Sequence, residues 1–187
     1  LVLDGAIIGS LDVPGQQDAY TFSLPIDSRL YFDSQTNSDN FNWSLNGPAG
    51  AVVSGRAFTG SDAISVSNPV LSVVAGDYTL TVGASGDVTG PYAFELLDLA
   101  NAELIAPGTP VSGSLDPANE SDLFRFDAAA GDRLFFDVQA RSGAGNARWR
   151  LVDPYSNVIF ERQFASTTTD VDTLVIPRAG TYTLLVE

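Results

Sequence analysis

The sequence contains no cysteine, no histidine and no methionine, and all nine of its basic residues are arginine. Without cysteine the chain can form no disulfide and no iron–sulfur cluster held by cysteine thiolates. Without histidine it can form no Ser-His-Asp triad, and without both it can form no zinc site of cysteine and histidine ligands. The lack of an initiator methionine predicts that these 187 residues are a piece of a longer chain with flanking domains.

Positive charge is also scarce, since the net charge is −14 and the pI about 4.1. Nucleic-acid binding needs a basic surface, so we expect no nucleic-acid partner. No apolar run approaches the roughly 20 residues of a membrane span. Hydrophobic residues make up 44% of the chain, which is enough for a folded core. A chain rich in acidic oxygens suits a hard cation, and calcium is the cofactor that we consider.

The chain repeats itself at an offset of 104 residues. Between 9–33 and 113–137, ten of 25 positions are identical. A later block, Ala75–Val82, matches Ala179–Val186 at the same offset. Unrelated segments would not match at one constant offset over so many residues, so we predict that the chain holds two copies of one module. We assign the copies to residues 1–100 and 105–187, separated by a segment that contains Pro107 and Pro110.

Alternation of apolar and polar residues predicts strands throughout. Tyr92, Phe94 and Leu96 alternate with polar or small residues, and similar runs recur at 18–24, 78–82 and 182–186. In 29–34 the same pattern places Leu30 and Phe32 inward and Tyr31 and Asp33 outward. Short alternating strands separated by Gly, Pro and Asp turns predict an all-β fold of two tandem antiparallel β-sandwich modules, jelly-roll-like in form.

The two copies differ at their ends. The strand expected at Tyr92–Leu96 has its counterpart at 196–200, past the last residue of the sequence. We therefore expect the second copy to lack its last strand. Its sheet would have an open edge, or an edge that another segment fills, and open edges favour pairing between chains.

The repeated pattern resembles the bacterial pre-peptidase C-terminal domain family. Three repeated blocks carry the resemblance. The first is Gly-Ser-Leu-Asp followed by an aromatic strand (9–22 and 113–126), and the second is Arg-Leu-aromatic-Phe-Asp (29–33 and 133–137). The third is Ala-Gly-x-Tyr-Thr-Leu-x-Val (75–82 and 179–186). The resemblance implies secreted or surface-exposed β-sandwiches that accompany proteases and large exoproteins. It also implies modules that are non-catalytic, and in some members calcium-dependent and substrate-binding.

Acidic residues bracket one turn in each copy and are the candidate calcium ligands. They are Asp116, Glu120 and Asp122 in the second copy and Asp12 and Asp18 in the first. Family members often carry Asp-x-Asp ahead of the first aromatic strand, where this chain has Gln16-Gln17-Asp18 and Glu120-Ser121-Asp122. The pair of acids is thus better preserved in the second copy. The alternative is that these side chains accept turn hydrogen bonds or are solvated.

Arginines are concentrated in the second copy and are the candidate ligand-binding residues. Bidentate contacts to an anionic glycan or a carboxylated partner would use Arg141, Arg148, Arg150 and Arg162. The alternative is that they balance neighbouring acids across strands. Trp43 and Trp149 would suit sugar stacking, but their matching positions in both copies favour core packing.

These observations predict a non-catalytic extracellular or cell-surface module of a larger bacterial protein, with a binding or spacing role and calcium as a stabiliser. Its partner would be an extracellular protein or a glycan surface. One alternative is a carbohydrate-binding module, and another is a ligand-free structural repeat of an adhesin stalk. An enzyme is not expected, because tandem duplication usually multiplies valency or reach.

Overall fold

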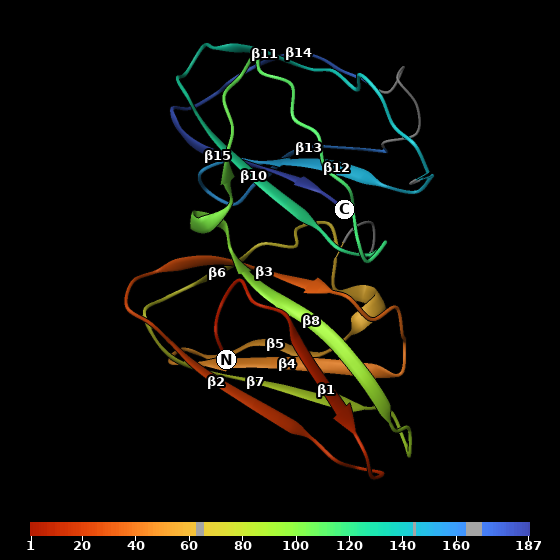
Figure 1. The fold of residues 1–187 in the computed structure, drawn as a ribbon. Coiled ribbons are helices and arrows are strands. Elements are labelled where there is room, and N and C mark those ends of the chain that lie inside the picture. The colour runs from red at the N-terminus through yellow and green to blue at the C-terminus, as the bar shows by residue number, and fades with distance from the viewer. Residues whose placement is uncertain (63–65, 144, 164–169) are drawn as a thin grey trace. The chain divides into compact units, whose positions relative to one another are not determined.

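The computed structural model describes residues 1–62, 66–143, 145–163 and 170–187 (Figure 1). The chain forms two compact units, Leu1–Asn101 and Ala102–Glu187. Both consist mainly of β-strands, and the first also contains the short 3-10 turns η1 (Phe58–Gly60) and η3 (Leu99–Asn101). The predicted all-β fold with sandwich-like antiparallel sheets is confirmed. Within the described ranges, no helix has the length and hydropathy needed to cross a membrane.

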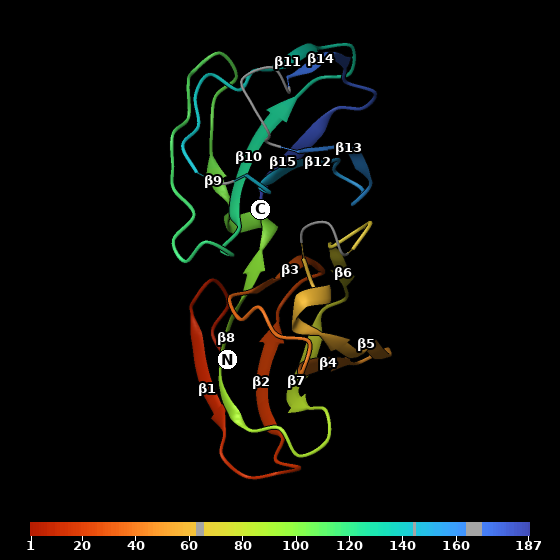
Figure 2. The ribbon, with the colours of Figure 1, turned by 90° about the vertical axis from the view of Figure 1, so that its right-hand side faces the viewer.

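The first unit is a sandwich of two four-stranded sheets, visible as two layers in Figure 2. In both sheets all neighbouring strands are antiparallel. One sheet has the order β1 (Ile7–Leu11), β8 (Gly90–Asp98), β3 (Ser28–Ser34), β6 (Leu71–Val73). The other has the order β2 (Asp18–Leu24), β7 (Gly76–Ala84), β4 (Phe41–Gly47), β5 (Gly50–Ala57).

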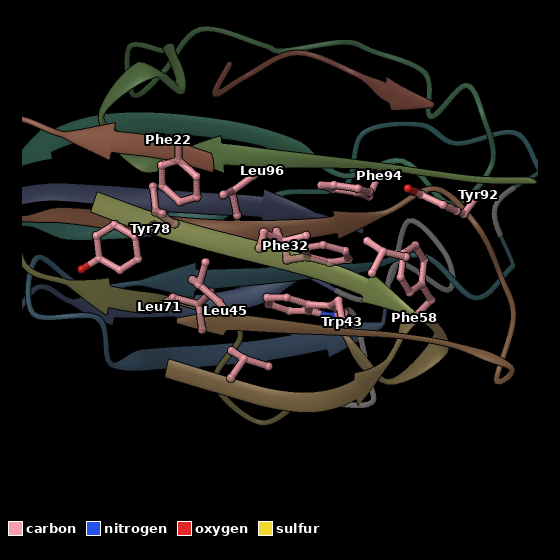
Figure 3. Packing of buried hydrophobic residues seen from close by; sticks show 14 of the residues in the cluster. Phe22, Phe32, Trp43, Leu45, Phe58, Leu71, Tyr78, Tyr92, Phe94 and Leu96 are labelled. Carbon is pink, nitrogen blue, oxygen red and sulfur yellow. The ribbon is translucent and has the colours of Figure 1, made fainter. Parts of the chain in front are cut away.

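Aromatic rings from the two sheets meet in the core of the first unit (Figure 3). Phe32 of β3 stacks on Trp43 of β4, with ring centroids 4.0 Å apart and planes 6° from parallel. Phe32 also stacks on Phe94 of β8, at 4.9 Å. Tyr92 and Phe94 are buried, as the alternation in β8 predicted.

The second unit contains a five-stranded sheet and a separate two-stranded sheet. The larger sheet has the order β13 (Val158–Gln163), β12 (Arg148–Val152), β15 (Gly180–Val186), β10 (Asp122–Ala128), β9 (Glu103–Leu104). The smaller one pairs β11 (Arg133–Phe136) with β14 (Val171–Val175). All pairs are antiparallel except β9 with β10. Residues of both sheets, including Phe126, Phe136 and Trp149, share one apolar core.

The repeated Ala-Gly-x-Tyr block has the same structural role in both copies. Gly76 has φ of +140° and Gly180 has φ of +145°, a conformation that L side chains rarely adopt. A Cβ atom at Gly76 would lie 2.3 Å from Cγ of Pro48, and one at Gly180 would lie 2.6 Å from Cγ of Pro154. The glycine is therefore required where β7 or β15 passes the proline of the neighbouring hairpin.

The tyrosine of the same block closes a turn. The Tyr78 hydroxyl donates to the carbonyl of Val74 at 2.7 Å, and the Tyr182 hydroxyl donates to the carbonyl of Arg178 at 2.8 Å. Both tyrosines are buried, and each buried hydroxyl thereby gains a partner. The glycine and the tyrosine that the two copies share in this block therefore both have roles in folding.

One part of the sequence prediction is wrong. Leu30 and Phe32 lie in the core as expected, but Tyr31 and Asp33 are not exposed, with relative accessibilities of 0% and 1%. Every residue of β3 from 30 to 34 is buried, so neither face of this part of the strand is left to solvent. Alternation identifies which residues share a face, but it does not show whether another segment covers the second face.

Candidate functional site in the acidic turns

The acidic turn of the first unit is held together by one glutamine. The Gln16 side-chain oxygen accepts hydrogen bonds from the backbone N–H of Asp12 at 2.7 Å and of Val13 at 3.3 Å. Its side-chain NH2 donates to Asp18 Oδ1 at 2.8 Å and to the carbonyl of Ser10 at 3.2 Å. A neutral amide thus links the two acids that the sequence suggested as cation ligands.

The second carboxylate oxygen of Asp18 is bound from β8. The Tyr92 hydroxyl donates to Asp18 Oδ2 at 2.6 Å, and the Tyr20 hydroxyl lies 2.5 Å from that of Tyr92. Burial raises the pKa of Tyr92 well above its usual range, and the hydrogen bonds to Asp18 and Tyr20 raise it further. Tyr92 therefore stays protonated, and both oxygens of Asp18 accept hydrogen bonds from side chains.

The second unit has the same turn with one decisive change, because Glu120 stands where the first copy has Gln16. Glu120 Oε2 accepts a hydrogen bond from the backbone N–H of Asp116 at 2.8 Å, as Gln16 does from Asp12. A carboxylate has no N–H to donate to Asp122. Burial raises the pKa of Asp122, and repulsion from Glu120 and then Glu103 raises it further.

The structure shows how the candidate calcium ligands of the two turns are hydrogen-bonded. Calcium takes about six to eight oxygen ligands. In the first copy each carboxylate oxygen of Asp18 accepts one side-chain hydrogen bond, Oδ1 from Gln16 and Oδ2 from Tyr92. In the part of the chain that the structure describes, no group of three or more acidic side chains is placed to hold a metal ion. The bridging role of Gln16 was missed from sequence, although its alignment with Glu120 was available as a signal.

Exchanging the two bridging residues should change the stability of the two units in opposite directions. Glu120→Gln is expected to stabilise the second unit by about 1 kcal/mol, because an amide would donate to Asp122 in place of a like charge. Gln16→Glu should destabilise the first unit by a similar amount. Differential scanning calorimetry would show each change as a shift of roughly 4–8 °C in one transition.

The effect of Glu120→Gln should also depend on pH. A carboxyl whose folded pKa is raised makes the folded state less stable as pH rises through that pKa, and the penalty is complete above it. The gain from Glu120→Gln is therefore expected to be largest at neutral pH and to shrink as pH falls toward the ordinary carboxyl value of 3.8. A gain that is the same at all pH values would contradict the repulsion between Glu120 and Asp122.

The arginines proposed as ligand contacts do not form one surface. Arg148 forms an ion pair with Glu161. Arg150 is fully buried, with its guanidinium 3.1 Å from Glu187 and 4.0 Å from Glu161. Both arginines of β12 thus form ion pairs with glutamates of neighbouring strands or segments. Because Arg150 is fully buried, a ligand could not reach it.

The remaining two arginines are exposed and bind nearby backbone. Arg141 donates to the carbonyl of Gly143 at 2.6 Å, and Arg162 donates to the carbonyl of Glu161 at 2.9 Å. Arg162 is paired across strands with Trp149, so its side chain leaves the sheet on the face opposite to Arg148. The structure brings Arg148 and Arg150 together and leaves Arg162 on the other side of the sheet.

Both tryptophans lie in the cores, as their repeated positions predicted. Trp43 is fully buried and donates from Nε1 to the hydroxyl of Ser61 at 2.7 Å. Trp149 is also buried and packs edge-on against Phe136 and Phe160. Neither indole presents a face on which a sugar ring could stack.

No family model matches this chain, and no curated protein matches it. Among solved structures, one similar chain is the CUB1-EGF-CUB2 domain of human MASP-1/3, at 8% identity and a TM-score of 0.27, covering 96% of this chain and 93% of that one. Another is dimeric latent PorU from Porphyromonas gingivalis, at 11% identity and a TM-score of 0.19, covering 97% of this chain and 20% of that one. Similarity this low carries no argument about function.

Proposed function

We propose that this chain is a tandem pair of modules of the pre-peptidase C-terminal type, serving a larger secreted or surface protein of bacteria as a non-catalytic binding or spacing element outside the cell. One observation carries the proposal: the blocks that the two copies share have structural roles in both. Gly76 and Gly180 make room for a proline, and Tyr78 and Tyr182 close the same turn. A duplicated module that retains its folding residues and varies the rest suits an element of reach or valency.

The carboxylates of the first acidic turn support the absence of catalysis. A general acid or base needs a carboxyl that can reach a substrate proton. Both oxygens of Asp18 accept hydrogen bonds from neighbouring side chains, and Ser10 donates to Asp12 Oδ1 at 2.8 Å. These acids hold a turn together through their hydrogen bonds.

The two alternatives are affected differently by the structure. The carbohydrate-binding alternative relied on aromatic platforms, and the burial of Trp43 and Trp149 removes the repeated pair. The ligand-free structural repeat needs no such surface and is compatible with the packing of both units. We therefore propose a spacing role that requires neither calcium nor a sugar.

Thermal unfolding in the presence of candidate ligands tests this proposal. Ligands that bind only the folded state raise the midpoint, by an amount that corresponds to about 2.7 kcal/mol at one hundred times Kd. We expect midpoints in EDTA, in millimolar calcium and with a panel of neutral and acidic oligosaccharides to agree within about 1 °C.

Magnesium is the control for calcium, and Asp122→Asn is the matched variant for the second turn. A rise with calcium but not magnesium that disappears in Asp122→Asn would show a calcium-stabilised module. A rise with one oligosaccharide would instead support the carbohydrate-binding alternative.

A further inference from the structure

Two equivalent turns carry different side chains in the two units. In each unit the proline that packs against the glycine of the Ala-Gly-x-Tyr block is followed by an exposed residue, which is Ala49 in the first unit and Tyr155 in the second. The residue whose carbonyl accepts the tyrosine hydroxyl is also exposed, and it is Val74 in the first unit and Arg178 in the second. Because the first unit forms these turns with alanine and valine, folding does not require tyrosine and arginine at the two positions.

The two side chains of the second unit contact each other. Arg178 Cζ lies 4.9 Å from the centroid of the Tyr155 ring, a cation–π contact. Tyr155 is nevertheless 62% exposed, and Arg178 is exposed as well. Stacking leaves the N–H groups of a guanidinium open, because they lie in its plane and point outward. In the part of the chain that the structure describes, no hydrogen-bond acceptor occupies those of Arg178.

The backbone fixes both partners of this contact. Asp153 Oδ1 accepts hydrogen bonds from the backbone N–H of Tyr155 and of Asn157, both at 2.8 Å. The Arg178 carbonyl accepts the hydrogen bond from the Tyr182 hydroxyl at 2.8 Å. The pair is therefore pre-organised, and a ligand that binds to it loses less free energy to the ordering of side chains.

Asp153 is affected by the charge of Arg178 but does not occupy its guanidinium. Burial raises the pKa of Asp153, whereas hydrogen bonds from Asn157 and Tyr155 and then the charge of Arg178 lower it overall. Both carboxylate oxygens of Asp153 accept hydrogen bonds from the Asn157 side chain, at 3.2 and 3.0 Å. Among the described residues, the arginines within 4.0 Å of a carboxylate are Arg148 and Arg150. The donors of Arg178 are thus left for a ligand.

The surroundings of the pair indicate the kind of ligand. A guanidinium edge binds a planar carboxylate through two parallel hydrogen bonds. The residues that flank the pair in the sequence include Pro154, Pro177 and Ala179, whose side chains have no hydrogen-bonding group, and Val175 nearby is 53% exposed. Sugar hydroxyls need polar side chains around them, whereas an acidic peptide brings a carboxylate with apolar neighbours. Seven of the nine arginines lie in the second unit, so an acidic segment meets less repulsion there than at the first.

We propose that Tyr155 and Arg178 bind an acidic segment of a protein partner, with an aspartate or glutamate carboxylate in the plane of the guanidinium and an apolar side chain of the partner against the tyrosine ring. The first unit lacks this site, because it has Ala49 and Val74 at the equivalent positions. The site goes beyond the proposed function, since it gives the second unit a partner that a spacing role does not need.

A capped peptide with one glutamate between apolar residues, Gly-Pro-Leu-Glu-Leu-Pro-Gly, is the direct probe. Titrated into the isotopically labelled 187-residue chain, it should shift the backbone NMR signals of Tyr155 and Arg178. A single charge-assisted contact corresponds to a Kd of roughly 1 mM. The same peptide with glutamine in place of glutamate should bind at least about tenfold more weakly. Equal binding of the two peptides, or no shift at about 10 mM peptide, would overturn the proposal.

Variants of the chain test the two side chains. Tyr155→Ala/Arg178→Val installs the residues of the first unit, so it should keep both melting transitions and abolish peptide binding. Tyr155→Phe keeps the ring and should bind as the original chain does, whereas Arg178→Lys loses the planar donors and should bind several-fold more weakly. Arg162→Val is the matched control, because it removes another exposed arginine of the same unit and should leave binding unchanged. Binding that survives the double variant would overturn the site.

An acidic oligosaccharide separates the two possible sources of a carboxylate. Oligogalacturonate should shift the signals of Tyr155 and Arg178 far less than the glutamate peptide does, because the flanking side chains offer no partners to its hydroxyls. Tighter binding of the oligosaccharide than of the peptide at these two residues would overturn the assignment to a protein partner. Failure of the peptide to bind would leave the proposed spacing role as it stands, so the two proposals are tested separately.

Discussion

Replacing Trp43 with alanine is expected to lower the free energy of unfolding of the first unit by about 3–5 kcal/mol. The indole is fully buried between the two sheets and stacks on Phe32 at 4.0 Å. Its removal leaves a cavity that the surrounding strands cannot close, because their positions are set by backbone pairing on both sides of β4. The Ser61 hydroxyl would also lose the hydrogen bond from Nε1.

Chemical denaturation followed by circular dichroism measures this loss, and two further variants divide it. Trp43→Phe keeps a ring against Phe32 and loses the hydrogen bond to Ser61, so it should cost clearly less than alanine. Trp149→Ala is the equivalent change in the second unit and should lower only the second transition. A loss below about 1 kcal/mol for Trp43→Ala would mean that the core of the first unit is much looser than the structure describes.

Replacing Arg150 with methionine is expected to destabilise the second unit by about 3–5 kcal/mol. Its guanidinium is fully buried and lies 3.1 Å from the Glu187 carboxylate, which is itself 9% exposed. Methionine fills a similar volume but leaves a buried negative charge without this cation. Breaking a buried pair from one side is costly, whereas an apolar pair of similar size is often tolerated.

The double variant Arg150→Met/Glu187→Gln should therefore recover much of the stability that Arg150→Met loses. Arg162→Met is the control, because Arg162 is exposed and its replacement should change the free energy of unfolding by less than about 0.5 kcal/mol. Equal losses in the single and double variants would show that the cost comes from packing and not from the charge of Glu187. Urea titrations at neutral pH provide the comparison.

The two variants also show how far the sequence alone predicted the molecule. The burial of Trp43 followed from its repetition in the second copy, because two matching positions rarely share an exposed role. The position of Arg150 did not follow, since alternation along β12 places it opposite Trp149 and Leu151 and suggests solvent. Its burial depends on what covers that face of the sheet, which periodicity along one strand does not contain.

The acidic turns show the same division. The sequence located both turns and paired Asp18 with Asp122 through the repeat. It did not show that Gln16 joins Asp12 to Asp18, or that Tyr92 arrives from a strand 74 residues further on to bind the same carboxylate. The Tyr92–Asp18 bond is long-range in the sequence, and the Gln16 bonds are local but depend on how the turn folds, so residue pattern alone specifies neither.

By itself, the sequence determined that the chain is all-β, and its repeat offset predicted two copies of one module. Residue periodicity and repeat offset are properties of the chain, so they can be read without coordinates. Only the tertiary structure decided that β8 lies between β1 and β3 in one sheet and that β2 and β5 are the edges of the other. Strand order is set by which apolar faces can be buried together, and local pattern does not specify it.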